Sequence, residues 1–137
     1  MRLTIAAHIS SLLTAMNNCE KRIDHPISDD NMQQAKIWYM AHRKTLETLV
    51  KEHCASGSGF DNGTHLDFDD SKPNKLVFHT SFHHMTEGTY DGWTQHRVIV
   101  KPAFHGVDIT IMGKDRNDIK DLIYACFHSD LMREVDL

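Results

Sequence analysis

The spacing of apolar residues changes once along this chain, and that change limits the folds open to it. In the first third, apolar side chains recur every three or four residues, which is the spacing of an amphipathic helix. After the Ser-Gly-Ser-Gly run at 56–59 the spacing becomes two, as in strands with one buried face. The sequence therefore predicts helices followed by an antiparallel sheet.

Two helices are predicted over 1–54. The stripe of the first is Ile5, Ile9, Leu12, Met16, Cys19 and Ile23. Asp24-His25-Pro26 ends it, and Ser28 suits the N-cap of the next helix. The stripe of the second is Met32, Ala35, Tyr39, His42, Leu46 and Leu49. The short connection predicts an antiparallel αα-hairpin.

Three apolar residues of the second helix lie off this seam. They are Ile37, Trp38 and Val50. We interpret them as a second apolar face, which packs either on the sheet or on another subunit.

Strands and a final helix are predicted over 64–137. Alternation indicates strands at 65–68, 76–83, 93–101 and 107–112, and Glu87-Gly88 with Asp91-Gly92 indicates a loop that carries Tyr90. Asp115 is the expected N-cap of the last helix. The predicted fold class is α+β in one domain, 1–137, with a four-stranded antiparallel sheet and the C-terminal helix packed on it.

The composition argues against several classes of protein. A formal net charge of -4 disfavours a protein that coats double-stranded nucleic acid by neutralising phosphates. The 3 cysteines are widely spaced and form no CxxC pair, which fits a reducing cytoplasm. No run approaches the ~20 apolar residues of a membrane span. We expect a cytoplasmic protein with no membrane partner.

Residues 76–118 concentrate histidine, aromatic and arginine side chains. Phe82 and Trp93 lie at the ends of adjacent predicted strands, beside His83 and His84, and could sandwich a purine. Stacking contributes about 1–3 kcal/mol per base. The same alternation also fits Phe82 as a core residue, so both interpretations stay open.

The run from Lys114 to Asp118 follows a strand and opens a helix. Unpaired N–H groups and the helix dipole favour an anion there. Arg116 adds a planar fork suited to phosphate, and Asp118 could accept from a ribose hydroxyl. Helix capping alone also explains Asp115 and Asp118, so an anion site and a plain helix cap both stay open as interpretations.

Two catalytic chemistries are alternatives to binding. Zinc needs convergent ligands, but alternation puts His79 and His83 on one face and His84 on the other. We therefore predict no metal and no cofactor. Paired His-x-Ser motifs at His79 and His8 would suit phosphodiester cleavage, although His8 falls in a helical pattern.

Four segments resemble a family of small phage proteins, the anti-Thoeris sponges. They are Ser56-Gly57-Ser58-Gly59-Phe60-Asp61, Phe82-His83-His84-Met85, Tyr90-Asp91-Gly92-Trp93 and Gly113-Lys114-Asp115-Arg116-Asn117-Asp118-Ile119-Lys120. The resemblance covers roughly residues 45–130. It implies a non-catalytic protein that sequesters cyclic ADP-ribose isomers in a host bacterial cell, and in some members cyclic oligonucleotides.

The resemblance also implies an assembly and a set of ligand contacts. Members form homo-oligomers, so a dimer or hexamer is expected, with a nucleotide pocket near the subunit contact. By position, Phe82 would stack on the adenine and Arg116, aided by Arg97, would hold the diphosphate. Asn117 or Asp118 would bind a ribose.

Three functional hypotheses follow from the sequence. The first is phage counter-defence by sequestration of a cyclic nucleotide immune messenger. The second is a phosphodiesterase that uses His79 and His8. The third is a protein that blocks a host factor through the hairpin face around Trp38.

Overall fold

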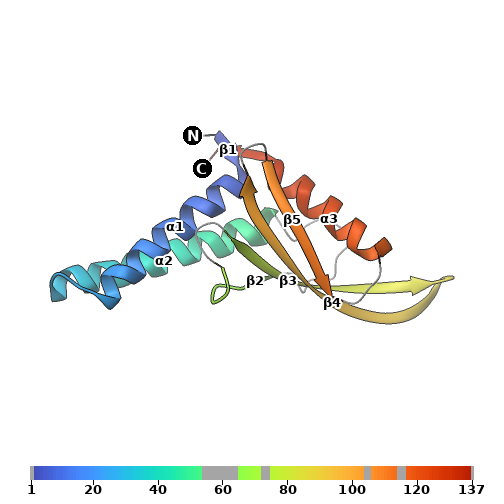
Figure 1. Ribbon diagram of the computed structural model, residues 1–137, viewed down its shortest axis with the longest axis horizontal. Helices are drawn as coiled ribbons and strands as arrows, with labels where there is room; N and C mark the ends of the chain where they lie inside the picture. The colour runs from blue at the N-terminus through green and yellow to red at the C-terminus, as the bar shows by residue number, and fades with distance from the viewer. Residues whose placement is uncertain (1, 54–64, 72–74, 104–105, 114–116, 137) are drawn as a thin grey trace.

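A helical hairpin and an antiparallel sheet share one core in this protein (Figure 1). The computed structural model describes residues 2–53, 65–71, 75–103, 106–113 and 117–136. The hairpin extends to one side of the sheet, and the last helix lies along one face of it (Figure 1). No helix in these ranges is both long and apolar enough to cross a membrane.

Local capping sets the bounds of the two hairpin helices. Helix α1 spans Ile5–Asp24, and the Thr4 hydroxyl accepts a hydrogen bond from the Ala7 N–H at 3.1 Å. Helix α2 spans Asp29–His53. The Ser28 hydroxyl accepts from the Asn31 N–H at 3.1 Å, which satisfies a donor of its first turn. The predicted hairpin and the Ser28 cap are confirmed.

The main sheet is antiparallel, with the order β2-β3-β4-β5. Its strands are β2 His65–Leu66, β3 Leu76–Thr86, β4 Thr89–Ala103 and β5 Gly106–Gly113. Helix α3, Asn117–Met132, follows β5. Strands β1 Arg2–Thr4 and β6 Glu134–Asp136 form a separate two-stranded sheet. The α+β class with antiparallel pairing is confirmed.

The predicted layout was wrong in two places. The β1–β6 sheet was missed, and residues 87–92 do not form a loop around Tyr90. Instead Glu87 and Gly88 make a tight turn with φ of 52° and 79°, and β4 begins at Thr89. Two successive residues with positive φ match the right-handed twist of a hairpin, so the strands can continue up to the turn.

One face of the main sheet is buried against the helices. Phe78 is fully buried, and its ring centroid lies 5.1 Å from that of Phe127 in α3. The core also takes in Val50, as the alternative in which the off-seam residues pack on the sheet expects, whereas Ile37 and Trp38 are 69% and 52% exposed. Burying a side chain such as Phe78 contributes roughly 1.5–3 kcal/mol.

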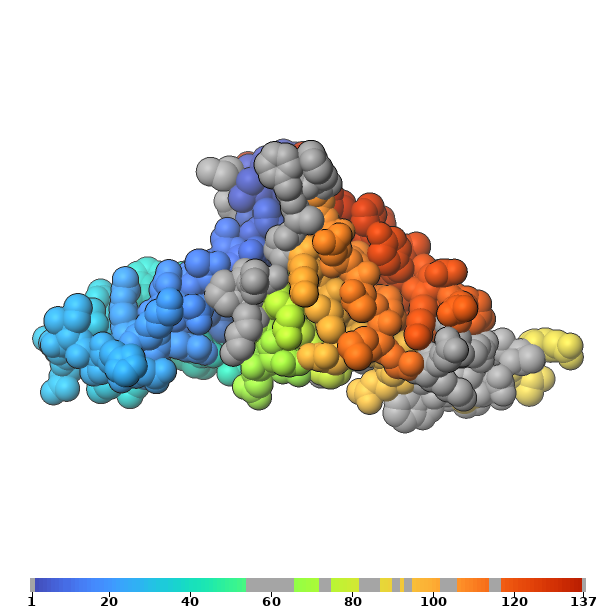
Figure 2. Space-filling view, in the orientation of Figure 1, coloured from blue at the N-terminus to red at the C-terminus, as the bar shows by residue number. Residues whose placement is uncertain are grey.

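Strands β3 and β4 continue beyond their neighbours as a two-stranded ribbon. Strand β5 pairs with β4 only from His96 to Ala103, and β2 pairs with β3 only at His79 and Phe78. The ribbon of 81–86 and 89–95, which we call the β-arm, projects from the body (Figures 1 and 2). An isolated two-stranded hairpin is only marginally stable in water, so the β-arm depends on its anchored base.

Candidate functional site

The predicted stacking residues lie on the β-arm. The backbone pairs Phe82 with Thr94 and His83 with Trp93, and the register shifts between His83 and Met85, next to His84. The structure describes the backbone of these predicted residues and not their side chains. The register therefore brings the Phe82-His83 and Trp93 segments side by side, as the sequence predicts.

The predicted anion site at the last helix is described in part. Arg116 lies outside the described residues. Asn117 and Asp118 begin α3 and are exposed. Gly113, at the end of β5, pairs with His96, which lies two residues from Thr94 on β4. At about 3.4 Å per residue this is roughly 7 Å along the strand, so the exit from β5 lies near the base of the β-arm.

Arg97 does not face the side of the sheet on which α3 packs. Its neighbours His96 and Val98 are buried, so alternation places Arg97 on the opposite, open face. There its guanidinium pairs with Asp70 and approaches the Met112 sulfur at 3.9 Å. Arg97 is therefore paired with Asp70 on the open face of the sheet and does not point toward the start of α3.

The open face carries a site that centres on His79. Its Nε2 lies 2.9 Å from Oδ2 of Asp67. The other oxygen of Asp67, Oδ1, accepts the backbone N–H groups of Asp69 and Asp70, each at 3.1 Å. An ionised Asp67 can only accept, so His79 donates from Nε2 and its ring orientation is fixed.

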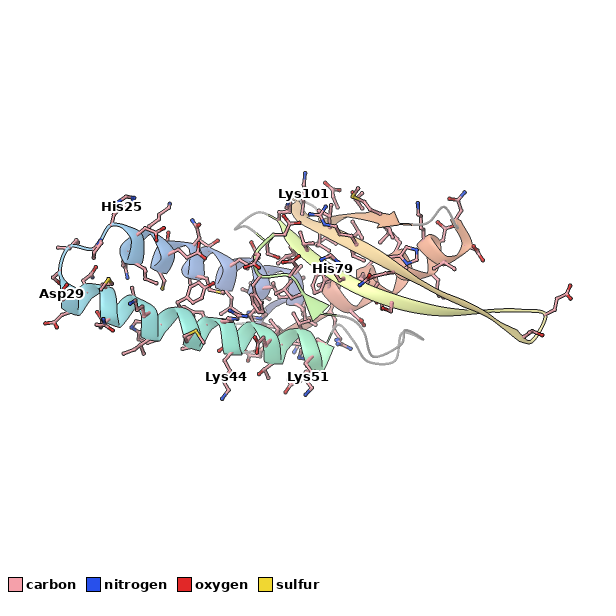
Figure 3. The ribbon with its side chains drawn as sticks, turned by 90° about the horizontal axis from the view of Figure 1, so that it is seen from below. His25, Asp29, Lys44, Lys51, His79 and Lys101 are labelled. Atoms are coloured by element: carbon pink, nitrogen blue, oxygen red, sulfur yellow. The ribbon has the colours of Figure 1, made fainter. Side chains whose placement is uncertain are left out.

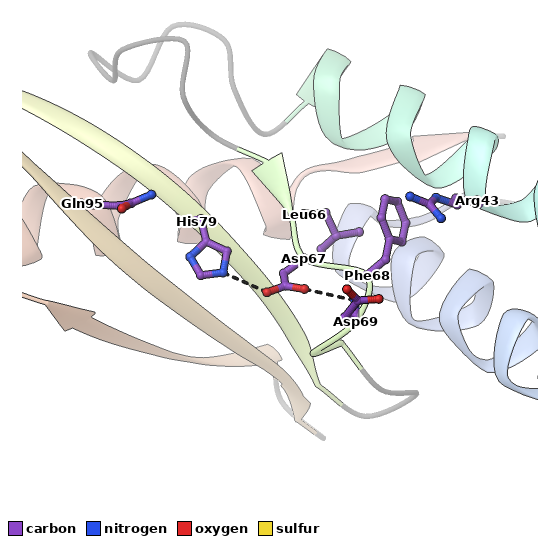
Figure 4. Close-up of a pocket in the computed structure, with 7 residues that line it drawn as sticks. All are labelled: Arg43, Leu66, Asp67, Phe68, Asp69, His79 and Gln95. Carbon is purple, nitrogen blue, oxygen red and sulfur yellow. Dashed lines mark hydrogen bonds and ion pairs between the residues drawn. The ribbon is translucent and has the colours of Figure 1, made fainter.

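This pair opens into a shallow hollow of about 530 Å³ (Figure 4). Its lining is Arg43, Leu66, Asp67, Phe68, Asp69, His79 and Gln95. The Arg43 guanidinium lies 4.5 Å from the centroid of the Phe68 ring, and its Nε lies 3.4 Å from Oε1 of Glu47. The hollow therefore combines an oriented imidazole with a stacked cation.

A smaller cavity of about 120 Å³ adjoins this hollow between the two hairpin helices. It shares Phe68 and Asp69 with the hollow and is also lined by Tyr39 and Glu20. Burial, followed by the Glu20 carboxylate, raises the pKa of the Tyr39 hydroxyl. Tyr39 is thus a neutral hydrogen-bonding group at physiological pH.

The structure does not bring His8 and His79 into one site. The Nε2 of His8 lies 2.8 Å from the carbonyl oxygen of Val135, on the small β1–β6 sheet. His79 is engaged by Asp67 on the main sheet. Within the described ranges, no group of three or more histidine, cysteine or acidic side chains could hold a metal ion.

Sequence reasoning identified His79 but missed Asp67 and Arg43. A signal for Asp67 exists, because an Asp-x-Asp sequence after a strand is typical of an Asx turn, whose first carboxylate is held in place. Arg43 carried no such signal, since its contact with Phe68 joins α2 to the turn after β2.

Comparison with known proteins identifies no similar protein. No family model, no curated protein and no solved structure matches this chain. The resemblance to the anti-Thoeris sponges therefore stays a hypothesis that rests on the four segments quoted above.

Proposed function

We propose that the protein binds a cyclic ADP-ribose-type nucleotide without cleaving it, and so sequesters an immune messenger in a host bacterial cell. The observation that carries the proposal is the strand register. It pairs His83 with Trp93 and Gly113 with His96, so two of the resembling segments pair along the β-arm and the one that begins at Gly113 starts near its base.

The chemistry of these segments suits such a ligand. The first turn of α3, at Asn117 and Asp118, offers N–H groups and the positive end of a helix dipole to a diphosphate. Arg116 supplies a charge-assisted donor, and Phe82 supplies a stacking surface for the adenine. The net charge of -4 is no obstacle, because only a local positive site is needed.

Titration calorimetry with cyclic ADP-ribose isomers tests the proposal. We expect stoichiometric binding and recovery of intact ligand after heat denaturation. Arg116→Ala should weaken binding by about 1.5–3 kcal/mol with little loss of thermal stability. Arg43→Ala, which changes an α2 arginine that lines the hollow beside His79, is the matched control and should leave binding unchanged. Absence of both heat and thermal shift at excess ligand would refute the proposal.

A phosphodiesterase is the second candidate, and the 2.9 Å contact between His79 and Asp67 favours it. A carboxylate that orients an imidazole is a common arrangement for a general base. Ligand returned as a hydrolysed product, with loss of turnover in His79→Ala, would support this function over sequestration. His8→Ala should then retain activity, because Val135 holds that ring on the other sheet.

A further inference from the structure

Helix α2 carries a second stripe, on a face that the described chain leaves uncovered. Trp38, Ala41, Thr45, Thr48 and Glu52 recur at intervals of four and three, which is the period of a helix–helix seam. All are exposed. Small side chains in the middle of this α2 outer stripe border a shallow hollow of about 430 Å³. A helix can approach closely where the seam residues are this small.

Helix α3 carries a matching stripe on its solvent side. Asp118, Leu122, Ala125 and Ser129 recur at the same intervals and are exposed. This α3 outer stripe lies opposite the buried stripe of α3, which packs on the sheet. Leu122 is 43% exposed and is the large apolar side chain of this stripe.

The two outer stripes have opposite charge on their flanks. Lys44 and Lys51 project from α2 on the side away from α1 (Figure 3). Asp121, next to Leu122 on α3, is exposed. Two copies of α3 would set acid against acid. The α2 outer stripe has mixed charge, because Glu52 lies on it, and α2 against α3 is the pairing that brings Lys44 and Lys51 to the acidic flank of α3.

We propose that the α3 outer stripe of one copy docks on the α2 outer stripe of a second copy. Leu122 then fills the hollow between Ala41, Thr45 and Thr48, and Asp121 lies beside the lysines. The two surfaces differ, so the contact is heterologous and leaves one free face of each kind on every pair. Further copies add until a ring closes or a filament forms. Asp118 belongs both to this stripe and to the proposed nucleotide site, so the tests below change only residues outside that site.

Charge reversal tests the interface in solution. The variants are Lys44→Glu/Lys51→Glu, which makes the flanks of both stripes acidic, and Asp121→Lys, which makes both flanks basic. Each alone should self-associate roughly tenfold more weakly than the wild type in analytical ultracentrifugation, because attraction becomes repulsion. An equimolar mixture should recover the wild-type mass, since the acidic stripes then meet basic ones. Lys36→Glu, on another face of α2, is the control and should sediment like the wild type.

Three outcomes would overturn the proposal. The first is a wild-type protein that sediments as a monomer at every concentration, which would leave these faces to a host protein. The second is an assembly that neither reversal weakens. The third is two weakened variants whose mixture does not reassemble, which would show that charge pairing between α2 and α3 does not hold the assembly together. Nucleotide binding, measured on the same samples, reports separately on the proposed nucleotide site, because none of the substituted residues belongs to it.

Discussion

Asp67 is the residue whose substitution most directly tests the open-face site. Its carboxylate holds the His79 ring with one oxygen and the backbone N–H groups of Asp69 and Asp70 with the other. Asp67→Ala removes all three hydrogen bonds. Asp67→Asn keeps an oxygen for the backbone groups and presents an amide N–H to His79, which must change tautomer to accept it.

The size of each effect follows from these partners. A hydrogen bond contributes about 0.5–1.5 kcal/mol, or about 1.5–3 kcal/mol when one partner is charged. The side chains of Asp67 and His79 are both 28% exposed, so water replaces part of what is lost. We expect Asp67→Ala to lower the free energy of unfolding by about 2–4 kcal/mol and Asp67→Asn by about 1 kcal/mol.

Urea titrations followed by circular dichroism measure both values. His79→Ala in the wild-type and Asp67→Asn backgrounds completes a double-mutant cycle, which should return a coupling energy of about 0.5–2 kcal/mol. Equal losses for Asp67→Ala and Asp67→Asn, or a coupling energy near zero, would refute the argument that this carboxylate organises the site.

Three further predictions concern Gly113 and α3. Gly113→Ala should lower the free energy of unfolding by about 1–3 kcal/mol, because φ is +150° and a Cβ would lie 2.7 Å from Cδ2 of His96. Gly88→Ala, at φ +79° in open space, should cost only about 1 kcal/mol, and equal losses in urea would contradict this steric reason. Burial raises the pKa of the Asp130 carboxyl above its ordinary value, so the folded state binds the proton more tightly than the unfolded chain does, and stability falls as pH rises through the folded-state pKa. Asp130→Asn should therefore melt at a higher temperature than the wild type at neutral pH but not at pH 3, and parallel pH profiles would rule this out. Burial, followed by the Asp130 charge, raises the pKa of the Cys126 thiol, so iodoacetamide should label this thiol slowly. Asp130→Asn should speed the labelling, and an unchanged labelling rate would contradict the role of the Asp130 charge.

The helical hairpin could be predicted because its signals are local. Ser28 caps α2 through residues three and four positions away, and the apolar stripes repeat within each helix. The β1–β6 pair could not be predicted in this way. It joins Arg2 to Asp136 across the whole chain, and three residues are too few to show alternation. Likewise, two turn signals in close succession, Glu87-Gly88 and Asp91-Gly92, indicate a loop, although only the first is a turn and the second lies within β4.

The candidate site was predicted less completely than the fold. Period-two alternation would have separated Arg97 from the side of the sheet that α3 covers, because the buried residues on either side of it, His96 and Val98, face the other way. The partner of His79 depends on how the turn after β2 folds back over the sheet, which no repeat in the sequence encodes. The sequence therefore indicated residues with functional side chains, such as His79, but not the residues that contact them in the fold.

The pairing of β1 with β6 decides how the fold would respond to mechanical force. Arg2 faces Asp136 at the outer end of this short ladder, and Thr4 faces Glu134 at the inner end. A pull on both termini would therefore break the paired residues one after another, in the unzipping geometry, instead of loading all of them at once in shear. Optical tweezers should record an early, low-force release of the chain ends before the α1 and α3 packing gives way.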